Sequence, residues 1–395
     1  MDNHRVPINS RLARLTLPAA LLLGFLAACQ QAGQPPSMVS VDPFDGGALH
    51  QAWSYSFDGP LNHAPLRVGD ILVAAPAEAP LAGLRAETGE LAWEFDPGVR
   101  IWDRAYASDG ERIYVGIEGG RLVALAPDRG ETLWQADLGI NTQIPPLPLN
   151  GVVYVSTTFV GTALTGNPSG KAVLFALDAA NGDVLWEFES GNYILQTAFL
   201  FKETIYVAGS YDDPAEVDEG GHMRLYALNA SDGSVRWSYE STDGYPKQLY
   251  ATANAVAYVA YQDFAVGVDA ANGELLWRRD TGNWVPTLSG SGDIIYYGSA
   301  NTVVHAVNTF SGEAVWQYNI PEGTFNYVIG APVPTGNELI FLTQQGDVAG
   351  LNRQTGELIW SLQTGITGAR AGLSVFGNWI YIGDAEGTVY GFTDR

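Results

Sequence analysis

Short apolar runs separated by polar turns recur along most of the chain, and they recur as nearly the same phrase. In LFALDAANGDVLWEFE, residues 174 to 189, two apolar runs flank a turn containing a glycine, and a tryptophan stands four residues after that glycine. Asp178, Asn229 and Asp269 open such turns, where a side-chain oxygen can accept hydrogen bonds from N–H groups two residues on. Glycine supplies the positive φ of a tight reversal. Each copy therefore predicts a β-hairpin whose tryptophan faces back over its own turn. The turn glycines are Gly89, Gly130, Gly182, Gly233, Gly273, Gly312 and Gly356.

A second, weaker phrase accompanies the hairpins. It is rich in Val, Ile and Tyr and breaks at glycine, as in RIYVGIEGG from Arg112 and IIYYGSANT from Ile294. This composition predicts a further strand and turn. With the segment before it, each unit holds four short strands in roughly 40 residues, and tandem antiparallel units of this size indicate a β-propeller.

The tryptophans give the number of blades. Eight of them recur at spacings of 40, 41, 52, 51, 40, 39 and 44 residues, so eight outer strands are present. The first outer strand, from His50, lacks preceding strands, and the chain ends in GTVYGFTDR without a final turn and tryptophan. We expect the N-terminal strand to complete the last blade and close the ring, which removes free sheet edges. The predicted fold is all-β, an eight-bladed propeller of four-stranded antiparallel blades. The repeat tryptophans are Trp53, Trp93, Trp134, Trp186, Trp237, Trp277, Trp316 and Trp360.

The first residues follow a different pattern. Arg5, Arg11 and Arg14 precede an apolar run at 15–28 that is too short for a stable membrane span and has the composition of an export signal. The sequence LAAC, ending at Cys29, resembles the bacterial lipoprotein signal, in which the cysteine is lipid-modified and becomes the first mature residue. The alternative is an ordinary signal peptide with a chance cysteine. We predict a lipoprotein signal peptide at 1–28, a flexible tether at 29–47 and the propeller at 48–395.

The charge of the chain narrows the range of partners. Removal of residues 1–28 takes away three arginines and one aspartate, which leaves 17 basic and 42 acidic residues and a net charge of −25. Such a surface should repel nucleic acid and anionic lipid headgroups. Solubility in an exposed compartment explains the charge without naming a partner.

The sequence contains no constellation typical of catalysis or metal binding. A single cysteine excludes a disulfide within the chain. The histidines do not pair at metal-ligand spacing, and His305 occupies a strand position held by Phe175 and Tyr226 in other repeats, which favours packing. The segment TGNPSGKAV from Thr165 lacks the first glycine and the final Ser or Thr of a phosphate loop. We therefore assign no catalytic residue, no metal site and no cofactor.

Two insertions lengthen adjacent repeats. The run from Asp212 to Glu219 carries five carboxylates, but their spacing does not match a calcium loop, so a solvated acidic loop is favoured. This loop and residues 157–171 cause the two long tryptophan spacings. Both fall between the second and third strands of their blades, so we expect them to project side by side on one face.

The connections between blades lie on that same face, and they carry aromatic and arginine residues at similar distances past each outer-strand tryptophan. Exposed aromatics with arginines are typical of recognition surfaces. The alternative is that these side chains only fill the inner rim of a wide ring. The candidate binding residues are Arg100, Trp102, Arg104, Tyr193, Tyr245, Trp284, Phe325, Tyr327 and Arg370.

The recurring phrase A-L-D-x-x-x-G-x-x-x-W resembles the repeat of the PQQ-like propeller superfamily over residues 50–395. The resemblance implies that the repeat tryptophans join each blade to its neighbour and have a structural role. Quinoprotein alcohol dehydrogenases in this superfamily are larger, hold calcium, and often stack the quinone PQQ against a disulfide of adjacent cysteines, which this chain lacks. The BamB-type lipoproteins, which act as scaffolds in outer-membrane β-barrel assembly, are similar in length, lipid signal and blade number.

These resemblances imply a non-catalytic, lipid-anchored propeller of the cell envelope that binds an envelope protein or complex as a monomer. If the organism is Gram-negative, the anchor would lie on the periplasmic side of the outer membrane; otherwise it would lie on the outer face of the cell membrane. A PQQ- and calcium-dependent alcohol or sugar dehydrogenase is the first alternative, and a saccharide or peptide receptor is the second.

The anchor prediction is directly testable. Cys29→Ala should move the protein from the detergent phase to the aqueous phase in a detergent-partition assay, because the only residue available for lipidation is then absent. Unchanged partitioning would contradict the lipoprotein assignment.

Overall fold

The computed structural model describes residues 44, 47–139, 142–157, 172–191, 194–211, 222–242, 244, 246–260, 263–321 and 327–395. The chain divides into two compact units, Met1–Gln30 and Gln31–Arg395, and every described residue belongs to the second. Cys29, Tyr193, Tyr245, Phe325 and the run 212–219 lie outside the described residues. Among the described residues all regular elements are strands, and no helix is long and apolar enough to span a membrane.

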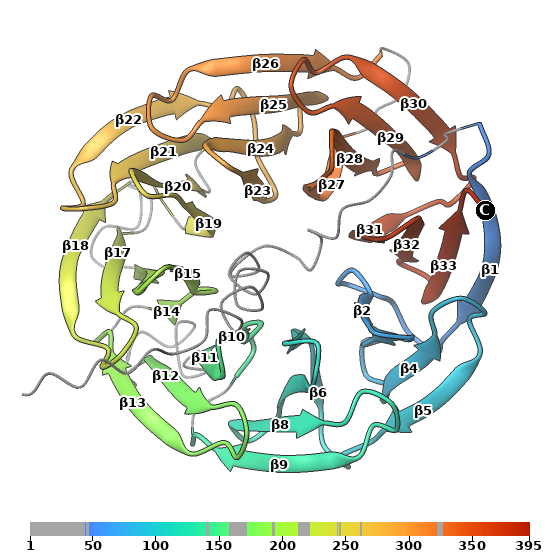
Figure 1. Cartoon of the computed structure of the whole chain (residues 1–395), viewed down its shortest axis with the longest axis horizontal. Coiled ribbons are helices and arrows are strands. Elements are labelled where there is room, and N and C mark those ends of the chain that lie inside the picture. The colour runs from blue at the N-terminus through green and yellow to red at the C-terminus, as the bar shows by residue number, and fades with distance from the viewer. Residues whose placement is uncertain are drawn as a thin grey trace, which may run out of the picture. The chain divides into compact units, whose positions relative to one another are not determined.

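The strands form eight separate antiparallel sheets, arranged as blades around a centre (Figure 1). Blade 1 consists of β2 (Leu66–Val68), β3 (Ile71–Ala74), β4 (Leu81–Arg85) and β5 (Leu91–Phe95). Blade 2 consists of β6 (Ile101–Ser108), β7 (Ile113–Ile117), β8 (Arg121–Leu125) and β9 (Thr132–Asp137). Blade 3 consists of β10 (Leu147–Leu149), β11 (Val152–Ser156), β12 (Val173–Asp178) and β13 (Val184–Glu189). Blade 4 consists of β14 (Ile194–Leu195) and β15 (Phe199–Phe201), which both pair with β16 (Thr204–Tyr211), followed by β17 (His222–Asn229) and β18 (Val235–Ser241).

The remaining blades repeat the same order from the innermost to the outermost strand. Blade 5 consists of β19 (Pro246–Ala251), β20 (Ala255–Ala260), β21 (Phe264–Asp269) and β22 (Leu275–Asp280). Blade 6 consists of β23 (Leu288–Ser291), β24 (Ile294–Ser299), β25 (Val303–Asn308) and β26 (Ala314–Asn319). Blade 7 consists of β27 (Val328–Thr335), β28 (Glu338–Thr343), β29 (Asp347–Asn352) and β30 (Leu358–Gln363). Blade 8 consists of β31 (Ala369–Phe376), β32 (Trp379–Asp384), β33 (Thr388–Thr393) and, outermost, β1 (His50–Ser56).

The predicted ring closure is confirmed. Strand β1 pairs antiparallel with β33, from His50 opposite Thr393 to Ser56 opposite Thr388. The first strand of the domain therefore supplies the outer strand of the last blade. The eight-bladed, all-β prediction is confirmed with it.

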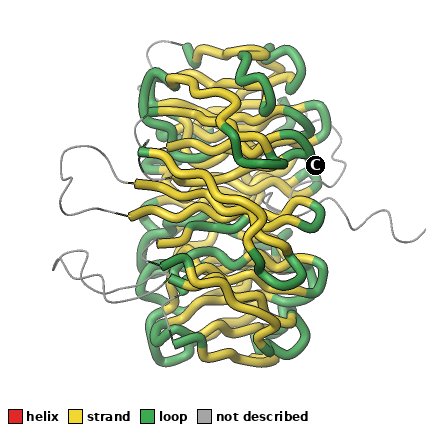
Figure 2. The backbone as a smooth tube through the Cα atoms, turned by 90° about the vertical axis from the view of Figure 1, so that its left-hand side faces the viewer, coloured by secondary structure: helices red, strands yellow, loops and turns green. Residues whose placement is uncertain are grey.

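The loops fall on two faces, and Figure 2 shows the strands running between them. We call the face with the second-to-third-strand loops and the blade-to-blade connections the connection face. The face with the first-to-second and third-to-fourth turns is the turn face. The insertions at 157–171 and 212–221 are bounded by second and third strands of blades 3 and 4, as predicted, so both begin and end on the connection face.

The turn-opening residues behave largely as predicted. Asp178 accepts the Ala180 N–H at 2.7 Å, and Asp269 accepts the Ala271 N–H, also at 2.7 Å. Asn229 differs, because its amide donates to Ser234 Oγ at 2.6 Å and its oxygen accepts from Arg236. The seven turn glycines have φ between 67° and 80°, the left-handed region that other residues adopt only with strain.

Seven of the eight repeat tryptophans pack on a turn of the neighbouring blade, and the prediction that they lie over their own turns is wrong. The indole of Trp53 covers Gly89 of blade 1, so closely that a β-carbon on that glycine would lie 2.5 Å from the ring. Its Nε1 donates to the Ala86 carbonyl, three residues before the glycine, at 3.1 Å. Six further tryptophans repeat this contact with Nε1–oxygen distances of 2.8–3.0 Å: Trp93, Trp134, Trp186, Trp237, Trp277 and Trp316. The structural role implied for these residues is therefore visible as an interblade contact.

A row of three residues positions each tryptophan within its own blade. Trp134 lies opposite Ala124 on β8, and Ala124 lies opposite Tyr114 on β7. Because the middle residue is small, the indole lies over it and reaches the tyrosine, with ring centroids 5.8 Å apart. The same row with glycine in the middle is Tyr381, Gly391 and Trp53. These in-blade contacts fix the position of the indole, whose other side packs on the next blade.

The boundary between blades 7 and 8 is different, because blade 8 has no turn between β33 and its outer strand. Trp360 Nε1 there donates to the Glu338 carboxylate of its own blade at 3.2 Å. Phe44, just before β1, packs against the Trp360 indole with centroids 5.9 Å apart, and its N–H donates to Glu338 at 3.4 Å. Glu338 is 2% exposed, and desolvation raises the pKa of its carboxyl although these two hydrogen bonds act to lower it. A buried carboxylate thus replaces the missing turn carbonyl.

The interblade contact predicts a large stability cost for Trp277→Ala. Truncation removes the cover of Gly312 and the hydrogen bond to the Thr309 carbonyl. Trp277 is partly buried, so the cost should approach the value of about 3–5 kcal/mol that is typical of a fully buried tryptophan. Calorimetry should show a clearly lower melting temperature. Leu275→Ala is the matched control, because Leu275 lies on the same strand and is 51% exposed, and it should leave the melting temperature nearly unchanged. Equal melting temperatures for the two variants would contradict the role assigned to Trp277.

The buried carboxyl predicts a pH dependence for Glu338→Gln. Since the folded protein raises the pKa of Glu338, it binds that proton more tightly than the unfolded chain does. The free energy of unfolding therefore decreases as the pH rises through the interval between the unfolded pKa and the folded one. Glutamine has no such dependence, so the stability of the wild type relative to the variant should be greater at about pH 4.5 than at about pH 7. A difference that is constant with pH would show that Glu338 is not desolvated.

Candidate binding site at the channel mouth

The innermost strands lose their regular register where they start, on the connection face. In β6, Ile101 lies opposite Ile117 and Tyr106 opposite Val115, so residues 102–105 face a single residue of β7. Similar breaks occur at residues 330–332 of β27, at 370–372 of β31 and at Lys247 of β19. Such bulges re-aim side chains and are frequent beside functional sites. We call the ring of these breaks the channel mouth.

Three predicted binding residues, Trp102, Arg104 and Arg370, lie within these breaks. Arg100 stands just before β6, and its guanidinium lies over the Trp102 ring at 4.7 Å from the centroid. Arg100, Arg104 and Arg370 are exposed, whereas Trp102 is half-buried. The bulge of β6 thus brings Trp102 and Arg104 together next to Arg100. Arg370 lies in the corresponding bulge of β31, two blades away.

The segment that leads into β2 lies between the two arginine-bearing strands. Tyr106 of β6 donates to the Ala64 carbonyl at 2.9 Å, and Ser374 of β31 donates to the Pro65 carbonyl at 2.6 Å. His63 packs edge-on against Tyr106 with centroids 5.4 Å apart. Desolvation, together with the charge of Arg104, lowers the pKa of His63 to about 4, so this imidazole is neutral near pH 7. Polar contacts from both sides thus hold the segment in place.

A second aromatic group lies at the starts of β19 and β27. Trp284 is 37% exposed and meets Tyr327 edge-on with centroids 6.2 Å apart. Lys247 lies over the Trp284 ring at 4.3 Å and donates to the Val285 carbonyl at 2.7 Å. Desolvation lowers the pKa of Lys247 to about 8, against the opposing effect of Asp263. The repeat pattern did not indicate Lys247, because only the register break in β19 shows that its side chain lies over Trp284.

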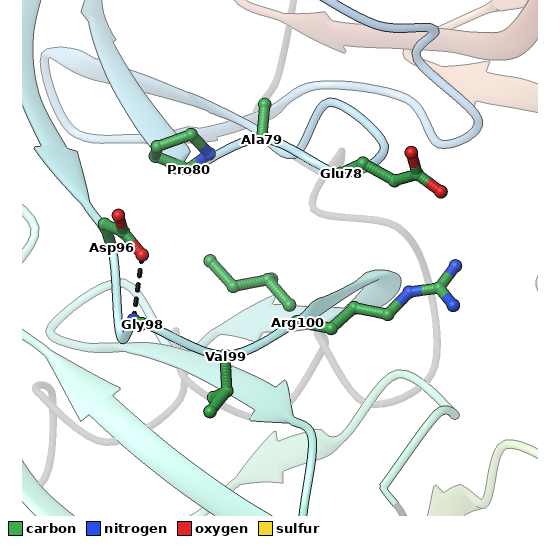
Figure 3. A pocket seen from close by; sticks show the side chains of 8 residues that line it. Glu78, Ala79, Pro80, Asp96, Gly98, Val99 and Arg100 are labelled. Atoms are coloured by element: carbon green, nitrogen blue, oxygen red, sulfur yellow. Dashed lines mark hydrogen bonds between the residues drawn. The ribbon is translucent and has the colours of Figure 1, made fainter.

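A pocket opens next to Arg100 on the connection face (Figure 3). It has a volume of about 570 Å³ and lies between the second-to-third-strand loop of blade 1 and the connection into blade 2. Glu78, Ala79 and Pro80 form one wall, and Val99 and Arg100 form the other. Asp96 accepts the Gly98 N–H at 2.8 Å, which shapes the connection at one end of the pocket. The pocket could not be predicted from the sequence, because its walls come from two loops without a repeated motif.

The described residues include no group of three or more His, Cys, Asp or Glu side chains placed to hold a metal ion. His305 is buried and its ring stacks on Tyr297 with centroids 4.7 Å apart. The Gln317 amide donates to His305 Nδ1, so the ring proton is on Nε2, which lies 3.0 Å from Ser299 Oγ. Desolvation lowers the pKa of His305 to about 4. The prediction that His305 serves packing is confirmed. The channel mouth contains hydrogen-bond donors, exposed aromatic rings and a pocket. These features suit the binding of a partner.

Comparisons with known proteins identify the relatives of this chain. A family model described as outer membrane protein assembly factor BamB matches residues 98–257 and 262–394. The outer membrane protein assembly factor BamB of Burkholderia pseudomallei is 26% identical over 367 residues, which cover 88% of each protein.

Solved structures share the fold. The crystal structure of BamB from Moraxella catarrhalis superimposes with a TM-score of 0.61 at 21% identity, covering 87% of this chain and 99% of that one. Quinohemoprotein alcohol dehydrogenase from Comamonas testosteroni gives a TM-score of 0.68 at 15% identity, covering 92% of this chain and 80% of that one. At these identities the likeness concerns the fold alone.

Proposed function

The chain belongs to the family described as outer membrane protein assembly factor BamB, and we propose that it acts as a non-catalytic, lipid-anchored scaffold in outer-membrane β-barrel assembly. The observation that carries the proposal is that the family model matches residues 98–257 and 262–394, and that a curated assembly factor matches 88% of the chain. An assembly role requires a protein partner in the cell envelope, so the chemistry of the channel mouth must be that of a protein interface.

The proposal places the protein in the cell envelope, held by a lipid on Cys29. Residues between Cys29 and the first described strand then act as a tether that lets the propeller reach its partner. The sheet of every blade is formed within one chain and β1 closes the ring, which supports the proposal that the protein acts as a monomer.

The partner binds the connection face at the channel mouth. Trp102 and Trp284 supply large, partly exposed aromatic surfaces, and each has a cation over its ring. Tryptophan and arginine are the residues in which interface energy concentrates. Tyr193 and Tyr245, predicted for the same face, are proposed to extend this surface.

The test is complementation in the organism that encodes the chain. Strains depleted of the protein should contain fewer folded outer-membrane β-barrels, and the wild-type chain should restore them. The Trp102→Ala/Trp284→Ala variant should restore them poorly, because loss of a hot-spot residue typically weakens binding by about 2 kcal/mol or more.

Phe310→Ala is the matched control, since Phe310 is an aromatic residue that is 51% exposed on the turn face. It should complement fully. Normal barrel levels after depletion would contradict the assembly role, whereas full complementation by the double tryptophan variant would contradict only the assigned face.

A further inference from the structure

Four hydrogen-bond donors at the channel mouth lack an acceptor in the part of the chain that the structure describes. The Arg100 guanidinium only stacks on Trp102, and Arg104 and Arg370 form neither an ion pair nor a side-chain hydrogen bond there. The Trp102 Nε1 is buried without a hydrogen-bond partner. A buried donor without an acceptor costs free energy, so this site suits a ligand that brings acceptors.

Some other arginines of this acidic chain form ion pairs, although Arg85 on the turn face also has none among the described residues. Arg112 pairs with Asp109 at 3.7 Å and with Glu111 at 3.3 Å, and Arg129 pairs with Asp128 at 3.4 Å. With 43 acidic and 20 basic residues in the sequence, carboxylates are abundant. The mouth arginines are nevertheless left without them.

Three carboxylates close to these arginines in sequence or across the sheet accept hydrogen bonds from other groups. Asp103 accepts the Asn62 amide at 2.6 Å, Glu118 accepts the Arg100 backbone N–H at 3.4 Å, and Asp96 accepts the Gly98 N–H. His63 adds no charge, because its imidazole is neutral near pH 7. Glu78 stands on the opposite wall of the pocket and opposes entry of an anion there (Figure 3). An acidic ligand would therefore extend from Arg100 toward Arg104 and Arg370.

The spacing of the donors favours an extended ligand. Arg104 lies on β6 of blade 2 and Arg370 on β31 of blade 8, and the segment before β2 of blade 1 lies between these strands. A ligand with several carboxylates along its length can engage both, whereas a single small anion would engage one at a time.

We propose that the channel mouth binds an extended acidic segment of a polypeptide, with Arg100, Arg104 and Arg370 receiving its carboxylates and Trp102 lying beside them. This inference rests on the proposed function, since it names the chemistry of the partner at the same face.

The test measures fluorescence anisotropy of a labelled peptide of alternating Glu and Ser with the full-length protein in detergent. The Glu–Ser peptide should bind at least tenfold more tightly than a Gln–Ser peptide, a difference of about 1.4 kcal/mol. Arg104→Gln/Arg370→Gln should lose most of that preference, and added salt should weaken binding. Arg85→Gln is the matched control, because Arg85 is also exposed and without an ion pair among the described residues, but lies at the turn face.

Equal binding of the two peptides, or of the double arginine variant and Arg85→Gln, would overturn the inference. Displacement of the peptide by inorganic phosphate at concentrations similar to that of the peptide would also overturn it, because the site would then be one for small anions. The assay contains no assembly partner. Peptide binding without an effect on barrel levels would therefore leave this inference standing and reject the assembly role, and the reverse result would reject this inference alone.

Discussion

The structure depends on one repeated contact, in which the indole of a tryptophan packs on a turn of the neighbouring blade. Trp134 is an example. The small Ala124 lies opposite it in the same sheet and leaves room for the ring. The ring packs on Gly182 of the next blade, and its N–H donates to the Ala179 carbonyl at 3.0 Å. Ala179 and Gly182 belong to the next blade, so no blade completes its core alone. Because repeats that bury surface against their neighbours stabilise one another, stability is shared around the ring.

The tryptophan contacts lie at the outer strands, and the inner strands of neighbouring blades also touch, as where Gly330 of β27 meets Gly372 of β31. Within this ring, β6, β27 and β31 depart from regular pairing at their starts. The bulges then present arginine and aromatic side chains that a continuous ladder would alternate between two faces. At the boundary between blades 7 and 8, where no turn exists, Glu338 accepts the Trp360 N–H and Phe44 packs on the Trp360 ring, so these two residues replace the turn.

The fold could be predicted from the sequence because its signals are local and periodic. The glycine turns, the tryptophan spacing and the unmatched first and last strands sufficed for eight blades and their closure. The direction of the indoles was predicted wrongly, because whether Trp93 covers its own turn at Gly89 or Gly130 of the next blade depends on how the blades stack. Arg104 and Arg370 were found by their offset from the repeat, but Lys247, Glu338 and the pocket beside Arg100 were not. The residues around them belong to other blades or to irregular loops, and such long-range contacts produce no repeated pattern in the sequence.

The central claim is that a rigid ring presents its channel mouth to an envelope partner. Hydrogen–deuterium exchange of the protein, alone and within its native membrane complex, tests this most directly. The account predicts slower exchange in the complex for residues 100–105 and 369–372, with no change in the turn-face segments 86–90 and 308–312. Protection of those turn-face segments, with exchange at the channel mouth unaltered, would contradict it.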